Sequence, residues 1–139
     1  MVWTPPPARA GHPYYMYESI YAQPGAIRLV LRANAETLRV AAERLKAVDR
    51  VFLSGIGTSW HACLVGELLL SRIGRLGHRV RAFHSFEFKN YWPDPDPRSG
   101  VIVVSHRGTK RFSLEALQKA KAGGGLAIAI TGRGSGDGL

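Results

Sequence analysis

Short apolar runs alternate with segments of helical periodicity along most of this 139-residue chain. Four runs rich in aliphatic residues are expected to be strands buried on both faces of a sheet. Three further segments place apolar residues every three or four positions and are expected to be helices. Strands that alternate with helices require right-handed crossovers and a parallel sheet with both faces covered, so the pattern predicts a doubly wound α/β fold. The expected strands are residues 51–53, 79–83, 101–105 and 126–130, and the expected helices are residues 62–73, 84–88 and 112–122.

The N-terminal part of the chain differs in composition from the rest. It begins with several prolines, which cannot propagate a helix, and continues with a cluster of tyrosines. A short helix is expected over residues 16–22, ended by Gln23 because the residue before a proline disfavours helical geometry. An amphipathic helix is expected over residues 26–48. We therefore divide the chain into a Pro/Tyr-rich arm, residues 1–24, and a domain, residues 25–139.

The chain is strongly basic, with 19 Lys and Arg against 10 Asp and Glu, a formal charge of +9 and an isoelectric point near 10.3. A positive excess raises the local concentration of anions, either phosphate esters or nucleic acids. Most of the cations are expected to form a solvated surface. They are spread over several segments without a recognition helix, a zinc finger or an RNA-binding sheet motif, which disfavours a nucleic acid as the partner.

The sequence contains none of the usual membrane signals. No stretch reaches the roughly 18 consecutive apolar residues of a membrane span, and residues 1–9 lack the apolar segment of a signal peptide. Cys63 is the only cysteine, which excludes an internal disulfide and fits a reducing compartment. A cytoplasmic location without membrane attachment is therefore expected.

A turn rich in glycine and hydroxyl side chains follows the first expected strand. Gly55 and Gly57 allow the backbone to turn sharply, and Thr58 or Ser59 is expected to cap the next helix. The free N–H groups at the start of that helix would then lie at the positive end of its dipole, where anions bind. Turns of this composition also join strands to helices in proteins that bind nothing there.

A second polar turn follows the third expected strand, and Thr109 or Ser113 is expected to cap the helix after it. In doubly wound sheets, ligands bind at the carboxyl ends of strands where the strand order reverses. With a strand order of 2-1-3-4, this position lies between the first and third strands, so the two polar turns meet there. The sequence then predicts a phosphate held by the hydroxyls of Thr58, Ser59 and Ser105. Cations of the second turn either add charge-assisted bonds or are merely solvated, and they are Arg107, Lys110 and Arg111.

Other kinds of site are poorly supported. His61 and Cys63 lack a second pair of ligands, so no metal is expected. Gly55-x-Gly57 lacks the third glycine of a dinucleotide fingerprint, and no P-loop lysine follows, so no cofactor is expected. Glu87 is the best candidate for a carboxylate in the site, although an acid near a helix start also complements the helix dipole. No catalytic residue is assigned.

Several motifs together resemble the SIS (sugar isomerase) domain family, most closely the first SIS module in the isomerase half of the fructose-6-phosphate transaminases. The resemblance covers roughly residues 14–135. It implies a flavodoxin-like three-layer α/β/α sandwich with a parallel sheet of order 2-1-3-4, of which a fifth strand is expected to be missing from this chain. The motifs are Met16-x-Glu18-x-Ile20-x-x-Gln23-Pro24, Gly57-Thr58-Ser59-x-His61-Ala62, Ser85-x-Glu87-Phe88 and Ser105-x-x-Gly108.

The resemblance also implies a function, with two departures from the family pattern. Members bind phosphosugars through hydroxyls of the first and third turns, and related modules form dimers. The family pattern of the third turn is similar to S-x-S-G-x-T, whereas this chain has Arg107 for the second serine and Lys110 for the threonine. The glutamate and lysine that catalyse the family's transaminase reaction come from a second module and a tail, and nothing in this chain matches them.

The expected function is therefore that of a phosphosugar-binding domain of a sugar isomerase or of a fructose-6-phosphate aminotransferase-like protein, acting as a homodimer. One alternative is a non-catalytic regulatory module that senses a phosphosugar. A second alternative, based on charge alone, is a basic nucleic-acid-binding protein. The residues expected to hold the ligand are Gly57, Thr58, Ser59, Ser105, His106, Arg107, Gly108 and Lys110, with Glu87 as the site carboxylate.

Overall fold

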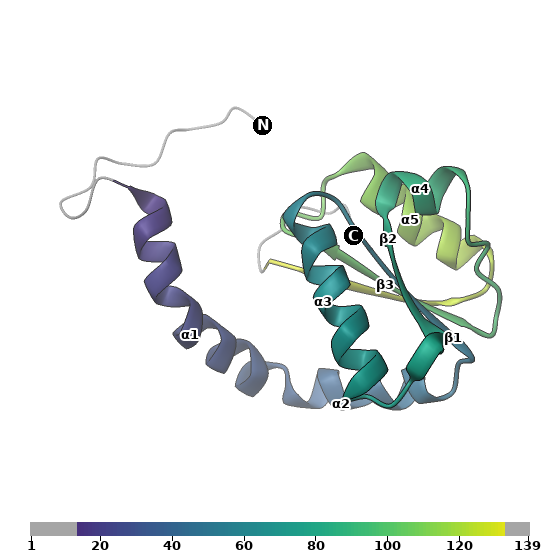
Figure 1. Cartoon of the computed structure of the whole chain (residues 1–139), viewed down its shortest axis with the longest axis horizontal. Helices are drawn as coiled ribbons and strands as arrows, with labels where there is room; N and C mark the ends of the chain where they lie inside the picture. Colours follow the sequence, from purple (N-terminus) through teal and green to yellow (C-terminus); the bar gives the residue numbers. More distant parts are fainter. Residues whose placement is uncertain (1–13, 133–139) are drawn as a thin grey trace. The chain divides into compact units, whose positions relative to one another are not determined.

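A four-stranded parallel sheet forms the centre of the computed structural model (Figure 1), which describes residues 14–132. The strand order is β2-β1-β3-β4, as predicted, and all three neighbouring pairs are parallel. In register, Val51 of β1 lies between Val80 of β2 and Gly100 of β3. The strands are β1 (Arg50–Gly55), β2 (Val80–His84), β3 (Ser99–Ser105) and β4 (Leu126–Thr131).

Helices cover both faces of this sheet and complete the three predicted layers. Figure 1 shows α3 (Thr58–Arg72) on one face, with α4 (Ser85–Asn90) and α5 (Arg111–Ala122) on the other. A short 3-10 helix, η1 (Gly77–Arg79), leads into β2.

The apolar core lies on both faces because side chains alternate along each strand. The core under α3 and the core under α4 and α5 each use alternate residues of β1. The α3 side contains Val51, Leu53, Cys63, Val80 and Ile102, and the opposite side contains Phe52, Phe88, Val101, Val103, Ala116, Leu117 and Ala120.

Two helices precede the sheet, and the break between them differs from the sequence prediction. A helix ending before Pro24 was expected, but Pro24 lies inside α1 (Tyr15–Ala33). The chain breaks instead at Asn34, whose side-chain amide and backbone N–H both donate to the carbonyl of Val30, at 2.8 and 3.1 Å. A side chain that competes for backbone hydrogen bonds in this way interrupts a helix, and α2 (Ala35–Lys46) begins at the next residue.

The chain divides into two compact units, with Arg39 the last residue of the first and Val40 the first residue of the second. The sheet and all of its covering helices belong to the second unit. The predicted boundary between residues 24 and 25 falls within α1, and the division into an arm and a domain stays a prediction. Among the helices of residues 14–132, none combines the length and the apolar character that crossing a membrane requires.

Candidate functional site

The carboxyl ends of β1 and β3 bring the two polar turns to the same place. Ser54 of β1 pairs with Val103 of β3, so the turns that leave these neighbouring parallel strands lie side by side at the carboxyl end of the sheet. Two contiguous cavities, each of about 330 Å³, open there. Five residues from both turns line both cavities, namely Thr58, Ser59, Val104, Ser105 and His106.

Each cavity is also lined by residues that do not line the other. We call the first the cationic cavity, because Arg107 and Lys110 line it. We call the second the edge cavity, because it extends to Thr131 and Gly132 at the end of the edge strand β4. The cationic cavity is completed by Ile56, Thr109 and Ser113, and the edge cavity by Ala62 and Ile130.

Ser105 lies where the cavities meet, and its hydroxyl has no hydrogen-bond partner within residues 14–132. The residue is 3% exposed. A buried polar group without a partner costs free energy, on the order of 1–3 kcal/mol, and native proteins rarely retain one without a use. The hydroxyl of Ser105 is therefore available to a ligand that enters either cavity.

The helix starts beside the cavities differ in their free donors. The first turn of α3 is closed on itself, since Ser59 N–H donates to the carbonyl of Ile56 (3.1 Å) and Trp60 N–H to that of Gly57 (3.0 Å). Neither Thr58 nor Ser59 caps this helix. Its cap position is Gly57, with no side-chain hydrogen bond, so the sequence prediction was wrong.

The first turn of α5 is open by comparison. Its cap residue is Lys110, no side chain caps it, and the predicted cap by Thr109 or Ser113 was wrong. No hydrogen bond within the described part of the chain uses the backbone N–H groups of residues 111–113. Because Lys110 and Ser113 both line the cationic cavity, the start of α5, with the positive end of its helix dipole, lies beside that cavity.

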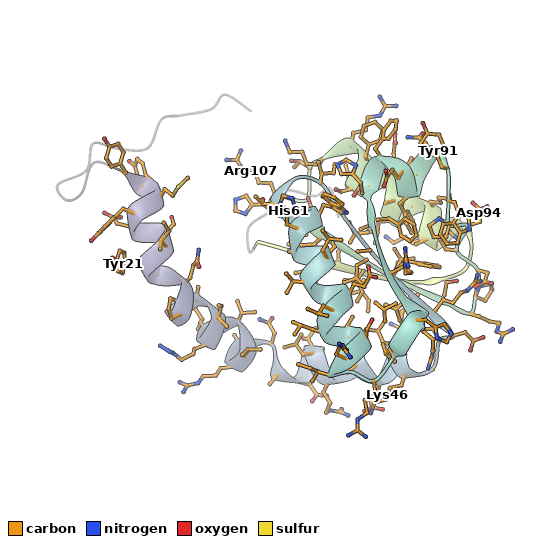
Figure 2. The ribbon with its side chains drawn as sticks, in the orientation of Figure 1. Tyr21, Lys46, His61, Tyr91, Asp94 and Arg107 are labelled. Carbon is orange, nitrogen blue, oxygen red and sulfur yellow. The ribbon has the colours of Figure 1, made fainter. Side chains whose placement is uncertain are left out.

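The charge around the cationic cavity is positive. Arg107 and Lys110 form no ion pair with any carboxylate in residues 14–132, and no carboxylate lines either cavity. Figure 2 shows Arg107 at the end of this unit where α3 begins. Arg111, by contrast, donates to Glu115 at 2.9 Å, and this hydrogen bond raises the pKa of the guanidinium. The anion-binding potential of the turn therefore rests on Arg107 and Lys110.

Buried serines support the floor of the cationic cavity. The hydroxyl of Ser54 on β1 is 2.9 Å from that of Ser85 on α4, which in turn is 3.5 Å from that of Ser113. All three residues are buried. They link the strand end to the first turn of α5 and position Ser113 at the cavity, a role that the sequence alone did not indicate.

The remaining predicted site residues lie around the cavities rather than in them. Gly57 and Gly108 do not line either cavity, and both adopt positive φ, +57° and +67°, which only glycine adopts readily. Glu87 lies exposed on α4 and lines neither cavity. Sequence reasoning missed Thr131 and Gly132, although both lie at or directly after the carboxyl end of a strand next to β3, where ligands bind in such sheets.

The single cysteine is part of the core. Cys63 is buried in α3 against β1 and β2 residues, and burial raises the pKa of its thiol to about 11. Such a thiol stays protonated and unreactive at neutral pH. Within the described range, 14–132, no three His, Cys, Asp or Glu side chains are grouped closely enough to hold a metal ion.

Comparison with known sequences identifies a family and several relatives. A model of the SIS domain family matches residues 44–137. A glutamine–fructose-6-phosphate aminotransferase (isomerizing) of Aeropyrum pernix is 38% identical over 133 residues, which are 93% of this chain and 21% of that protein. The protein of the same name from Thermococcus kodakarensis is 33% identical over 123 residues, 88% of this chain and 20% of that protein. The chain thus spans about a fifth of the length of these relatives.

Solved structures show the same fold. The C-terminal domain of glucosamine-fructose-6-phosphate aminotransferase from Francisella tularensis has a TM-score of 0.77 at 20% identity, over 92% of this chain and 37% of that one. The tagatose-6-phosphate ketose/aldose isomerase of Escherichia coli has a TM-score of 0.62 at 23% identity, over 91% of this chain and 35% of that one. These likenesses agree with the predicted α/β architecture and strand order.

Proposed function

The chain belongs to the SIS domain family, and from this membership and the geometry of its two polar turns we propose that it binds a phosphosugar. The phosphate lies in the cationic cavity, and the sugar extends past the first turn toward the edge cavity. Cavities of several hundred Å³ that combine an apolar lining with a few polar groups are typical of small-molecule sites.

The unpartnered hydroxyl of Ser105 is the observation that supports this proposal most strongly. It is buried, it lies between the two turns, and it gains a hydrogen bond only when a ligand is present. A phosphate at this position also accepts from the free N–H groups of α5 and from the ammonium of Lys110. All three kinds of donor converge on one anion.

Thr58 and Ser59 have a different role in this arrangement. The backbone donors of their turn are largely used within the turn itself, so what they offer a ligand is their hydroxyl groups. Hydroxyls both donate and accept, which suits the alcohol groups of a sugar better than a fully ionised phosphate. We assign Thr58 and Ser59 to the sugar, and Ser105, Arg107 and Lys110 to its anionic groups.

We propose binding, rather than turnover, as the activity of this chain by itself. Proton transfer next to a carbonyl needs a general base within hydrogen-bond reach of the substrate. Among residues 14–132 no carboxylate lines either cavity, and Glu87 lies outside both. The relatives named as isomerising aminotransferases are about five times longer than this chain. We propose their reaction only for a longer protein that contains such a module.

Calorimetric titration with fructose 6-phosphate and glucosamine 6-phosphate tests the proposal. Wild-type protein is expected to bind, and Ser105→Ala is expected to weaken binding by about tenfold or more, because a hydrogen bond to a charged group is lost. Ser71→Ala, on α3 outside both cavities, is the matched control and keeps wild-type affinity. Absence of any sugar-phosphate heat, or equal affinity in Ser105→Ala, would contradict the proposal.

We also propose that the protein forms a homodimer. α3 exposes a row of large apolar side chains that the rest of the sheet unit does not cover, and a second copy is the partner we propose for this surface. Sedimentation is expected to show a dimer, which Leu68→Glu converts to a monomer. A monomeric wild-type profile would contradict this. The exposed residues are Leu64, Val65, Leu68, Leu69 and Ile73.

A cytoplasmic location completes the proposal. The fold uses no disulfide, because its single cysteine, Cys63, is buried and unpaired. Cell fractionation is expected to recover the protein with cytoplasmic markers, and recovery in an oxidising compartment would contradict the assignment.

A further inference from the structure

We propose that the ligand carries a second anionic group, and therefore that the preferred substrate class is a sugar phosphate that is also a sugar acid or a bisphosphate. This inference rests on the proposed phosphosugar function and refines it. It follows from the excess of positive charge at the cationic cavity, from the lack of any carboxylate of residues 14–132 in its lining, and from the position of Arg107.

The charge at the cationic cavity exceeds what one phosphate requires. Arg107 and Lys110 each contribute one positive charge, and the open start of α5 contributes about half a charge. The start of α3, where the Thr58 N–H has no hydrogen-bond partner among residues 14–132, adds a smaller amount. A phosphate dianion leaves a net positive charge of about one half to one at the site. A ligand with one further negative charge balances that remainder.

Within residues 14–132, no carboxylate balances these charges. Neighbouring cations that lie near acids are paired, as with Arg111 and Glu115 directly after the turn. At the opposite end of the sheet, Arg50 pairs with Asp96 at 2.7 Å. Arg107 and Lys110 have no such partner in the described ranges of the chain, although both line a cavity. Their charges are therefore available to groups brought in by a ligand.

The two cations stand at different parts of the site. Lys110 is the cap residue of α5, directly beside the free N–H groups where the phosphate is placed. Arg107 comes three residues earlier in the turn, at the end of the unit where α3 begins (Figure 2). Its planar guanidinium presents two parallel donors, a geometry that matches a carboxylate or a phosphate. Arg107 therefore lines the same cavity as Lys110 but from another part of the turn, which places it for a second anionic group of the ligand.

The presence of Ser105 distinguishes this cluster from an ordinary basic surface. Its buried hydroxyl lacks any partner among residues 14–132 and lines the same cavity as both cations. A solvated patch would leave no such group unsatisfied at its centre. The cations and the hydroxyl therefore belong to one ligand site. A ligand that binds there needs negative charge to balance the positive charge of the site.

The test compares three ligands that differ in charge at the end away from the 6-phosphate. Calorimetric titration of the full 139-residue chain uses fructose 6-phosphate, 6-phosphogluconate and fructose 1,6-bisphosphate at one fixed salt concentration. We expect the two doubly anionic ligands to bind about tenfold or more tightly than fructose 6-phosphate, because each adds charge-assisted hydrogen bonds. A preference confined to 6-phosphogluconate identifies a carboxylate as the second group, and one confined to the bisphosphate identifies a phosphate.

Variants separate a local contact from the general charge of the protein. Arg107→Ser, which also introduces a hydroxyl, is expected to abolish the preference, because it weakens binding of the two doubly anionic ligands more than binding of fructose 6-phosphate. Arg72→Ser is the matched control, since it removes the same charge from an exposed position on α3 outside both cavities. It is expected to leave the preference intact. Both replaced residues are exposed, so folding is preserved, and circular dichroism checks this.

Two outcomes overturn the inference and are distinguishable from failure of the proposed function. If the wild type binds all three ligands with equal affinity, the proposed preference for a second anionic group is wrong, whereas phosphosugar binding still holds. An equal loss of preference in Arg72→Ser and Arg107→Ser shows that net charge, rather than a contact at Arg107, produced it. If none of the three ligands binds, the proposed function fails, and this inference fails with it.

Discussion

Strand β3 begins and ends with a buried serine, and the two serines are in opposite situations. Ser99, at the amino end, donates to the Asp96 carboxylate at 2.6 Å and accepts from the Asp96 N–H at 3.2 Å. Ser105, at the carboxyl end, has no partner within the part of the chain that the structure describes. The same side chain in the same strand thus stabilises the fold at one end and remains available for binding at the other.

The charged groups around the two serines follow the same division. At the amino end, Asp96 also accepts from Arg50 and from the backbone N–H of Arg98, so its carboxylate is fully used. At the carboxyl end, Arg107 and Lys110 have no carboxylate partner in residues 14–132. The amino end of the sheet is therefore where we expect changes to affect stability, and the carboxyl end is where we expect them to affect binding.

The largest expected effect is a loss of stability at the amino end. Gly123, which follows α5, lies so close to Pro95 that an added Cβ would overlap the Pro95 carbonyl oxygen and would lie 2.9 Å from its carbon. Gly123→Ala should destabilise the protein by about 3 kcal/mol, because backbone must shift to make room. Chemical denaturation measures this. Gly25→Ala, with open space around its Cβ, is the matched control and should show no loss.

The two serines of β3 give a direct test of the division. Ser99→Ala should cost about 1–2 kcal/mol of unfolding free energy, because it removes both hydrogen bonds between the buried Ser99 hydroxyl and Asp96. Ser105→Ala should leave stability unchanged or slightly increased, since it removes an unsatisfied hydroxyl, while weakening sugar-phosphate binding. Denaturation and calorimetry on both variants measure the two quantities. A stability loss in Ser105→Ala equal to that in Ser99→Ala would contradict the division.

The dependence of stability on pH should come from the amino end. The Ser99 hydroxyl first, and then Arg50 and the Arg98 N–H, lower the pKa of Asp96 in the folded protein. A lowered folded pKa gives a stabilisation that is complete above the unfolded value of about 4 and is lost as the pH falls through the folded value. Denaturation at pH 7, 5 and 3 should show that Asp96→Asn differs from wild type by about the same amount at pH 7 and pH 5 and by less at pH 3. A constant difference would exclude this role for Asp96, whereas Ser105→Ala should retain the wild-type profile.

The smallest expected effect concerns the carboxyl end. Glu115→Gln removes the ion pair of Arg111 and frees a third cation next to the cationic cavity. Affinity for fructose 6-phosphate should rise by about twofold to threefold at low salt, and the gain should fall as salt is added, because an exposed charge contributes little. Calorimetry at two salt concentrations measures this. An unchanged affinity would mean that Arg111 is too far from the bound anion to act on it.

Much of the fold could be predicted from local pattern. The aliphatic run ending in Ser105 predicted β3, and the resemblance to a known family implied the order 2-1-3-4 that the structure has. The meeting of the two polar turns followed from that order. The helices before the sheet were predicted less well. Pro24 predicted a helix end but lies inside α1, and the helix breaks instead at Asn34, whose side chain competes for the carbonyl of Val30.

The candidate site was predicted in its residue types, but not in the roles of its two turns. Both turns contain glycine and hydroxyl groups before a helix, and the sequence predicted free N–H groups at the start of the first of these helices. In the structure, the N–H groups of Ser59 and Trp60 donate to carbonyls of the turn, whereas those of residues 111–113 have no acceptor among the described residues. Such pairing depends on backbone angles that a list of residue types does not contain.

Residue order alone thus determined the strands of the sheet, the helices that cover it, and which turns carry hydroxyls and cations, because these follow from apolar spacing and side-chain chemistry within a few residues. Three-dimensional packing decided which of those groups remain unpaired. Among the described residues, Glu115 neutralises Arg111, no acid pairs with Arg107, and the buried hydroxyl of Ser105 has no hydrogen-bond partner. A hydrogen bond or ion pair needs its partner within about 3–4 Å, and only the folded chain brings distant residues to that distance or keeps them apart.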